Sequence, residues 1–327
     1  MYEGMKRQFA LISILSALAL PAAAQDFSAP GMPDPALPNI SGAALPGISG
    51  YAPAAPKGPL SRVANVSLSL KAKLTDNGED LTRGLTWRVF RPDPGPDGKL
   101  PLVASSQGGS ATFELVPGSY LVHAAFGRAG ATKRITLRKD AATEVVVLDA
   151  GGLKLNAVGP GGKQVHAEKL RFSIYEAKQD ANGDRPLVAK DIKPNSVVRL
   201  NAGMYHVVST YGAINAVVRS DIRVEAGKLT EAAVEHSAGE ITLKLVREAG
   251  GEALADTSWS ILTESGDPVT EKVGPYASMV LANGNYTVIA KNRDHIYQRN
   301  ITVEGGIDAE LEVLANEQSE IDPGDGE

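Results

Sequence analysis

The stretch FELVPGSYLVHA, residues 113–124, holds a glycine two positions before a tyrosine, and apolar residues alternate along it. It returns as VRLNAGMYHVVS at 198–209 and as VLANGNYTVIA at 280–290. The Gly-x-Tyr glycines, at 118, 203 and 284, are therefore 85 and 81 residues apart. Glycine permits a positive φ or a close turn where the chain enters a new strand, and tyrosine buries a large ring while its hydroxyl can reach backbone or solvent near the rim of the sandwich. The chain therefore contains three copies of one unit.

A bulky aromatic residue in an alternating run is a second marker of the repeat. It precedes the tyrosine by 33, 33 and 27 residues (87 to 120, 172 to 205, 259 to 286). Alternation with a period of two predicts strands with one buried face, and no long window shows a helical stripe. Asn-Gly and Asp-Gly pairs mark the turns between these runs. About seven short strands in each copy predict an antiparallel sandwich of two sheets.

The run Val116-Pro117-Gly118-Ser119-Tyr120 resembles transthyretin-like, carboxypeptidase-regulatory-like and PEGA-type repeats. The other copies have Ala202 and Asn283 in place of the proline. The resemblance covers roughly residues 61–315 and concerns the fold only. It implies all-β architecture, with three tandem antiparallel Ig-like or prealbumin-like β-sandwich modules. Such repeats are accessory, adhesive or scaffolding parts of secreted proteins, and the resemblance brings no catalytic residues.

The predicted modules occupy consecutive segments of the chain. Their boundaries are placed at very short glycine-bearing junctions, where the last strand of one module is expected to run almost directly into the first strand of the next. We predict modules over 61–150, 151–238 and 239–315, followed by an acidic disordered tail over 316–327.

The N-terminus is typical of an exported bacterial protein. Residues 1–24 combine two basic residues, an apolar run and an Ala-Ala-Ala site, the pattern of a cleaved signal peptide. A retained anchor is the alternative, although the run is short for a spanning helix. Residues 25–60, rich in Pro, Ala and Gly, predict a disordered linker. We expect no transmembrane segment in the mature chain, and a periplasmic location, with secretion from the cell as the alternative.

Charge and composition exclude several classes of function. The net charge of −5 argues against a nucleic-acid-binding protein, and the absence of cysteine excludes disulfides and thiolate metal sites. Residues 61–150 and 151–238 each carry +3, whereas 239–327 carry −11, of which the tail supplies −5. This asymmetry predicts salt-dependent head-to-tail self-association; ordinary solvated surface is the alternative.

Catalytic motifs are lacking, and we expect neither enzymatic activity nor a cofactor. The five histidines form no close cluster, so no metal site is expected. Asp180-Ala-Asn182-Gly-Asp184 resembles the start of a calcium loop, but Arg185 replaces the required glycine, so a hairpin turn is predicted instead.

One run in the second copy is richer in polar and aromatic residues than its equivalents. A binding surface there would involve His206, Tyr211, Asn215 and Arg219; core packing of the tyrosines is the alternative. The sequence thus favours an exported, non-catalytic envelope protein, an array of modules that binds or scaffolds a protein or glycan partner. An enzyme or metalloprotein whose site assembles between modules, and a secreted adhesin, are the alternatives.

Overall fold

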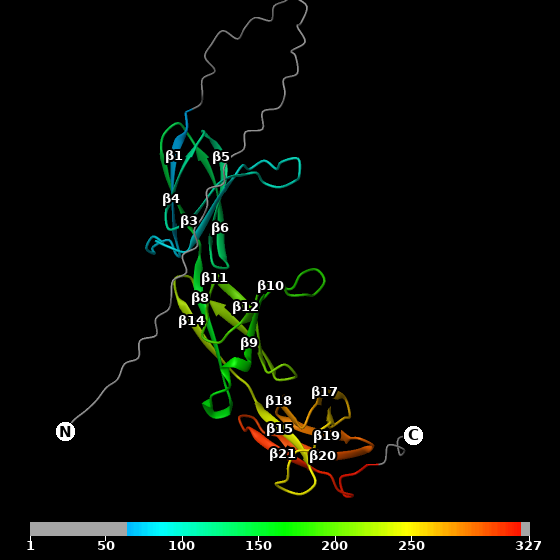
Figure 1. Ribbon diagram of the computed structural model, residues 1–327. Coiled ribbons are helices and arrows are strands. Elements are labelled where there is room, and N and C mark those ends of the chain that lie inside the picture. Colours follow the sequence, from blue (N-terminus) through cyan, green and yellow to red (C-terminus); the bar gives the residue numbers. More distant parts are fainter. Residues whose placement is uncertain (1–63, 322–327) are drawn as a thin grey trace, which may run out of the picture. The chain divides into compact units, whose positions relative to one another are not determined.

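A computed structural model describes residues 64–321. The predicted signal peptide, the linker and the last six residues of the tail lie outside this range. The described part is all-β, with two one-turn 3-10 helices at Pro160–Gly162 and Ala167–Lys169 (Figure 1). No helix within it is both long and apolar enough to span a bilayer.

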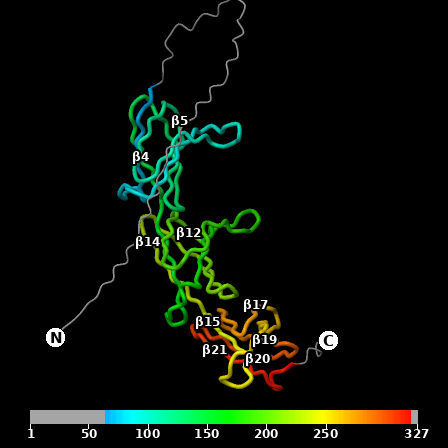
Figure 2. Tube along the Cα trace, in the orientation of Figure 1, coloured from blue at the N-terminus to red at the C-terminus, as the bar shows by residue number. Residues whose placement is uncertain are grey.

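Three modules of seven strands follow one another, and each occupies one block of the colour gradient in Figure 2. The strands of the first are β1 (Val66–Lys73), β2 (Leu85–Phe90), β3 (Leu102–Gly108), β4 (Ala111–Leu115), β5 (Gly118–Phe126), β6 (Ala129–Leu137) and β7 (Ala142–Val147). Those of the second are β8 (Ala150–Val158), β9 (Leu170–Glu176), β10 (Leu187–Ile192), β11 (Val197–Asn201), β12 (Gly203–Tyr211), β13 (Val217–Val224) and β14 (Leu229–Glu235). Those of the third are β15 (Ala238–Val246), β16 (Thr257–Thr263), β17 (Pro268–Val273), β18 (Tyr276–Ala282), β19 (Gly284–Asn292), β20 (His295–Val303) and β21 (Ala309–Leu314).

Each module pairs a three-stranded with a four-stranded sheet, which confirms the predicted fold class. In the first module the orders are β4-β1-β7 and β3-β2-β5-β6, and the other two repeat them. The first and last strands of every module pair in parallel, unlike all other pairs. A parallel pair needs a long crossover, and here the five intervening strands provide it.

The markers of the repeat lie in the cores. Trp87, Phe172 and Trp259 are almost fully buried, and both tryptophan N–H groups donate to glycine carbonyls at 2.8 and 2.9 Å. The three marker tyrosines each donate from the hydroxyl to the carbonyl four residues upstream, at 2.7 to 2.9 Å. This bond ties the turn to the strand that follows it. All three copies share this hydrogen bond. They do not share the glycine conformation, because Gly203 and Gly284 have a positive φ and Gly118 does not.

Two residues link β7 to β8, and two link β14 to β15. The last strand of one module therefore runs almost directly into the first strand of the next. The proposed boundaries after 150 and 238 fall one residue into the following strand. The hairpin turn expected at Asp180 is also confirmed, because its carboxylate accepts the N–H groups of Asn182 and Asp184 at 2.8 and 3.0 Å.

Candidate functional site at the module joints

At the first joint, the β5–β6 hairpin meets the β11–β12 turn of the second module. Gly127, at φ 68°, lies so close to Arg199 that a Cβ on the glycine would be 2.9 Å from the Arg199 Cβ. The Asn201 amide forms a pair of bonds with the Gly130 peptide group, both at 3.2 Å, and also donates to the Leu148 carbonyl at 2.7 Å. One asparagine therefore binds both the hairpin and the link.

The second joint uses the same positions. Gly212 is 85 residues after Gly127, has φ 74°, and its Cβ would lie 2.7 Å from the Cβ of Val280, which is 81 residues after Arg199. Here the asparagine is on the hairpin: Asn215 accepts from the Ala282 N–H at 2.9 Å and donates to the Tyr286 hydroxyl at 2.8 Å. Asn215 lies three residues after Gly212, as Gly130 lies three residues after Gly127, and Ala282 corresponds to Asn201 (201 plus 81). The amide has changed sides between the two joints.

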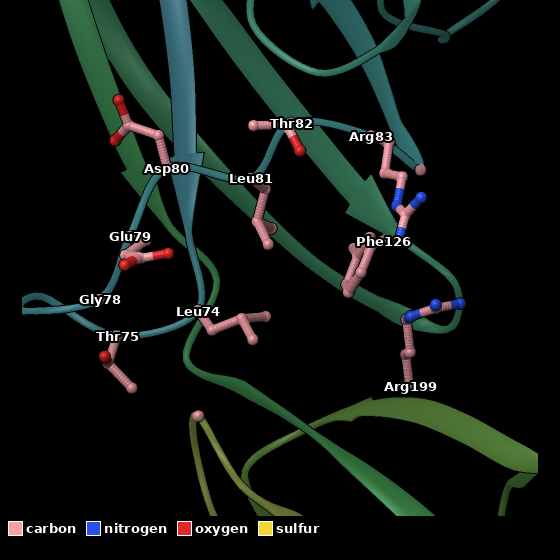
Figure 3. A pocket seen from close by; sticks show the side chains of 12 residues that line it. Leu74, Thr75, Gly78, Glu79, Asp80, Leu81, Thr82, Arg83, Phe126 and Arg199 are labelled. Carbon is pink, nitrogen blue, oxygen red and sulfur yellow. The ribbon is translucent and has the colours of Figure 1, made fainter.

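A groove of about 660 Å³ opens at the first joint, between the 74–84 loop, the end of β5 and two residues of the second module (Figure 3). The Arg199 guanidinium lies over the Phe126 ring, 4.4 Å from its centroid, and Arg83 flanks the same ring. Within residues 64–321 neither arginine has an ion-pair partner. Gly84 lies against Phe126, since a Cβ there would be 2.9 Å from the ring.

Carboxylates line the other end of this groove. Asp80 forms an ion pair with Lys71 at 2.8 Å, and this hydrogen bond lowers the pKa of the Asp80 carboxyl. Glu79 beside it is exposed. The groove therefore offers two guanidinium groups beside an apolar ring at one end and hydrogen-bond acceptors at the other. Such a surface can bind an anionic group on an extended polar ligand.

Charged contacts connect the corresponding segments at the second joint. Lys163 donates to the Gly306 carbonyl at 3.3 Å, and the His166 ring lies 3.1 Å from Asp308. Lys169 bonds Glu240, which raises the pKa of the Lys169 ammonium. Burial opposes ionisation of Asp308, but hydrogen bonds from the Glu240 N–H and His166 lower the pKa of its carboxyl overall.

His166, Glu240 and Asp308 thus form a cluster of a histidine with two carboxylates, which we call the second-joint latch together with Lys169. No local sequence pattern predicts this cluster, because Glu240 and Asp308 are 74 and 142 residues from His166. Lys169 already supplies a positive charge to Glu240, so the arrangement works as an ion-pair network between modules.

The second joint also contains a buried polar pair. Ser209 and His236 are 0% and 1% exposed, and Ser209 Oγ lies 2.7 Å from His236 Nε2. Burial lowers the pKa of His236. The equivalent positions in the first module are Ala124 and Leu148 (209 minus 85, 236 minus 88). A hydroxyl bonded to an imidazole is the start of a nucleophilic site, but both groups are enclosed here and serve packing.

The structure separates the four predicted binding residues into two pairs. His206 and Arg219 lie on neighbouring strands β12 and β13, where His206 contacts Asp221 at 2.7 Å. Tyr211 is buried edge-on against His236, 5.8 Å between ring centroids, and its hydroxyl accepts from the His166 N–H at 3.3 Å. Asn215 makes the joint contacts described above. Asn215 therefore links the second module to the third, whereas Tyr211 packs within the second.

Arg199, Asn201, Phe126 and Arg83 were missed as functional candidates. When the three copies are aligned, Gly127 and Gly212 occupy the same position, and the third copy has Arg293 there (212 plus 81). That shared glycine would have pointed to the two hairpins that form joints.

Fold and joints together define a tandem β-sandwich array, and the comparisons with known proteins agree with a repeat. Residues 240–315, most of the third module, match a family described as the Rhizobiales growth-associated tandem repeat domain. No curated protein sequence matches the chain. The predicted fold-level resemblance to β-sandwich repeats is therefore confirmed.

Several solved structures are similar to this chain. The Bacillus anthracis TIE protein shares 20% identity over 77% of this chain and 50% of its own, with a TM-score of 0.22. GBS52, the minor pilin of Streptococcus agalactiae, shares 15% over 52% of this chain and 95% of its own, with a TM-score of 0.29. BcpA, the major pilin subunit of Bacillus cereus, shares 9% over 77% and 100%, with a TM-score of 0.22. The chain thus spans half the length of the Bacillus anthracis TIE protein.

Proposed function

We propose that this chain is an exported, non-catalytic protein of the cell envelope, whose three modules bind or scaffold a protein or polysaccharide partner. The N-terminal pattern supports export to the periplasm, with release as a secreted adhesin as the alternative. The match of the third module to a family described as a growth-associated tandem repeat domain supports a role connected with growth.

The observation that carries this proposal is the groove at the first joint. Binding sites are common where two domains meet, because the walls come from different elements and the joint fixes their separation. Asn201 connects the two modules at this joint through three hydrogen bonds. Arg83 and Arg199 face the groove without an ion-pair partner in the described part, so a carboxylate-bearing partner would supply the missing charge.

The test compares capture by the wild-type protein with capture by the double variant Arg83→Ala/Arg199→Ala. Isolated peptidoglycan and detergent-extracted envelope proteins are offered in separate arms. Arg134→Ala/Arg138→Ala removes the same charge from exposed positions outside the groove and is the matched control. We expect the groove variant to lose its partner in one arm while the control keeps it. Equal retention by all three proteins in both arms would overturn the proposal.

The second-joint latch favours one alternative, a metal site assembled between modules. His166, Glu240 and Asp308 place ligand atoms within 4.8 Å of one another. Titration with Zn²⁺, followed by calorimetry, tests it, with Lys169→Ala as a variant that frees Glu240. Micromolar Zn²⁺ binding by the wild-type protein that Asp308→Asn abolishes would support a metalloprotein. If Zn²⁺ gave no more heat with the wild-type protein than with Asp308→Asn, the metal site would be rejected.

A further inference from the structure

The third module ends in a hairpin that differs from those of the first two joints. β19 and β20 are joined at Arg293, the position of Gly127 and Gly212, and Arg293 adopts the left-handed φ of 54° without being glycine. At the two joints this position meets the residue at 199 or 280 of the following module. The third hairpin therefore presents a charged side chain where the others present none.

Residues 316–321, here called the C-terminal cap, lie along the start of β20. The Ile321 N–H donates to the Ile296 carbonyl at 2.8 Å, and the Gln298 N–H donates to the Ser319 carbonyl at 2.7 Å. The His295 ring contacts Glu320 at 2.6 Å. Ile296 takes the place of Gly130 in the sheet, since Ile296 pairs with Lys291 and Gly130 pairs with the corresponding Ala125 (291 minus 166). Gly130 is the hairpin residue that bonds the next module at the first joint. The cap thus occupies the bonding position that a following module uses elsewhere.

The first module carries the complementary half of a joint. Glu114 and Val116 correspond to Arg199 and Asn201 (each minus 85). Among residues 64–321 nothing covers them, since Glu114 is exposed and Val116 is 39% exposed. Val116 lies in the turn that, in the second and third modules, contacts the hairpin of the preceding module. If a third hairpin met this turn at the same positions, Arg293 would lie opposite Glu114, a pair of opposite charges. The Cβ of Arg293 requires a wider approach than the glycine joints, where a Cβ would be 2.7 to 2.9 Å from the facing residue.

We propose that the C-terminal cap covers the hairpin surface of the third module, and that this surface accepts the first module of a second copy once the cap is displaced. This inference rests on the proposed scaffolding function and names a second copy as one partner. Two intrachain joints built on the same positions support the choice of facing surfaces. Long-range attraction supports it too, because the first two modules are each +3 and the third module without its tail is −6 (−11 less −5).

Cysteine reporters test the proposal cleanly, because the chain has no cysteine of its own. One copy carries Val116→Cys and a second copy carries Asp294→Cys, and a short bis-maleimide links them where the two surfaces meet. The pair is compared in the full chain and in a chain lacking residues 316–327. A control pair replaces Asp294→Cys with Val273→Cys, which is 79% exposed elsewhere in the third module.

We expect the shortened chain to cross-link at least several-fold more than the control pair, and less so at 0.5 M salt, while the full chain stays near the control. Glu114→Arg in one copy should reduce the product, and Arg293→Glu in the other should restore it. Cross-linking no greater than that of the control pair, or no response to the charge exchange, would overturn the proposal.

A second variant guards against misfolding of the shortened chain. Ile321→Pro keeps the chain length but removes the N–H that bonds Ile296. It should also raise cross-linking of the 116–294 pair, and unchanged cross-linking in both uncapped proteins counts against the cap. Capture by the groove variants is measured on capped protein, so failure of this inference leaves the result for the proposed function separate.

Discussion

The two joints of this chain share their backbone positions but differ in their chemistry. Both place a left-handed hairpin glycine against the next module and join the hairpin to a turn through one asparagine. Around the first, two arginines lie in a groove without ion-pair partners in the described part; around the second, ion pairs connect the modules. The shared positions therefore define how modules join, and the differing ones are free to serve binding at one joint and attachment at the other.

The largest effect is expected from Gly212→Ala, which tests the shared part of the comparison. The new Cβ would meet Val280 at 2.7 Å in addition to the left-handed strain, so we expect a loss of about 2 to 4 kcal/mol in the free energy of unfolding. Gly127→Ala, at 2.9 Å from Arg199, should behave similarly. Urea unfolding of both variants measures the loss.

The control for this prediction is Gly266→Ala. Gly266 has φ 88°, but a Cβ there would meet no atom within 4 Å, so only the backbone strain of about 1 to 2 kcal/mol remains. If all three substitutions cost the same, close approach at the joints contributes nothing and the comparison fails.

Asn201→Ala should have the next largest effect. It removes three hydrogen bonds and leaves the Leu148 carbonyl without that partner, which we expect to cost about 1 to 3 kcal/mol. Amide hydrogen exchange should report faster opening at Gly130, on the hairpin side of the joint. The control is Asn283→Ala, at an exposed position of the second joint, which copies Ala202 and should leave amide exchange at that joint unchanged. If exchange there accelerated as much, the amide of Asn201 would not be what holds the first joint.

The sequence predicted the modules well because their signals are local. Alternation around Trp87 and the Gly-x-Tyr turn at Tyr120 report burial and turn geometry within a few residues, and both recur in register. The joints were harder to predict, since Asn201 and Gly130 are 71 residues apart and no local pattern connects them. Asn215 was selected as a binding residue for its polarity, yet its amide is used within the joint.

The parallel pairing of first and last strands was missed for the same reason. β1 and β7 are both ordinary alternating strands, and their direction relative to each other follows from the whole module between them. The groove was missed because its two arginines belong to different modules and have different neighbours in sequence. Local periodicity therefore predicts elements and repeats, while contacts between repeats require the packed molecule.

The buried pair Ser209 and His236 predicts a pH dependence of stability at the second joint, in addition to that of His123 in the first module, whose pKa burial also lowers. Burial lowers the pKa of His236 in the folded chain below its ordinary value of 6.5. A group with a lowered folded pKa binds its proton more tightly when unfolded, so stability is highest above pH 6.5 and falls as the pH drops below it. Thermal unfolding between pH 8 and pH 5 should show this loss.

The matched variant for this prediction is Ser209→Ala/His236→Leu, which copies Ala124 and Leu148 of the first module. It removes the buried titration and keeps the packing, so its stability should vary less over the same pH range. An unchanged slope in the double variant would place the pH dependence in another group.

The smallest effect is expected at the latch. Lys169 and Glu240 are 35% and 21% exposed, so Lys169→Ala should cost only about 0.2 to 1 kcal/mol, and salt should weaken the contact further. The difference between wild type and variant is measured by urea unfolding at low salt and at 1 M salt.

The first joint carries Gly152 and Leu229 where the second carries Glu240 and Asp308 (240 minus 88, 308 minus 79), so it offers no equivalent pair. Cross-linking across the first joint should therefore stay constant with salt, while cross-linking across the second should fall. If salt loosens both joints equally, the latch does not distinguish them, and the second joint depends on its glycine and asparagine as the first does.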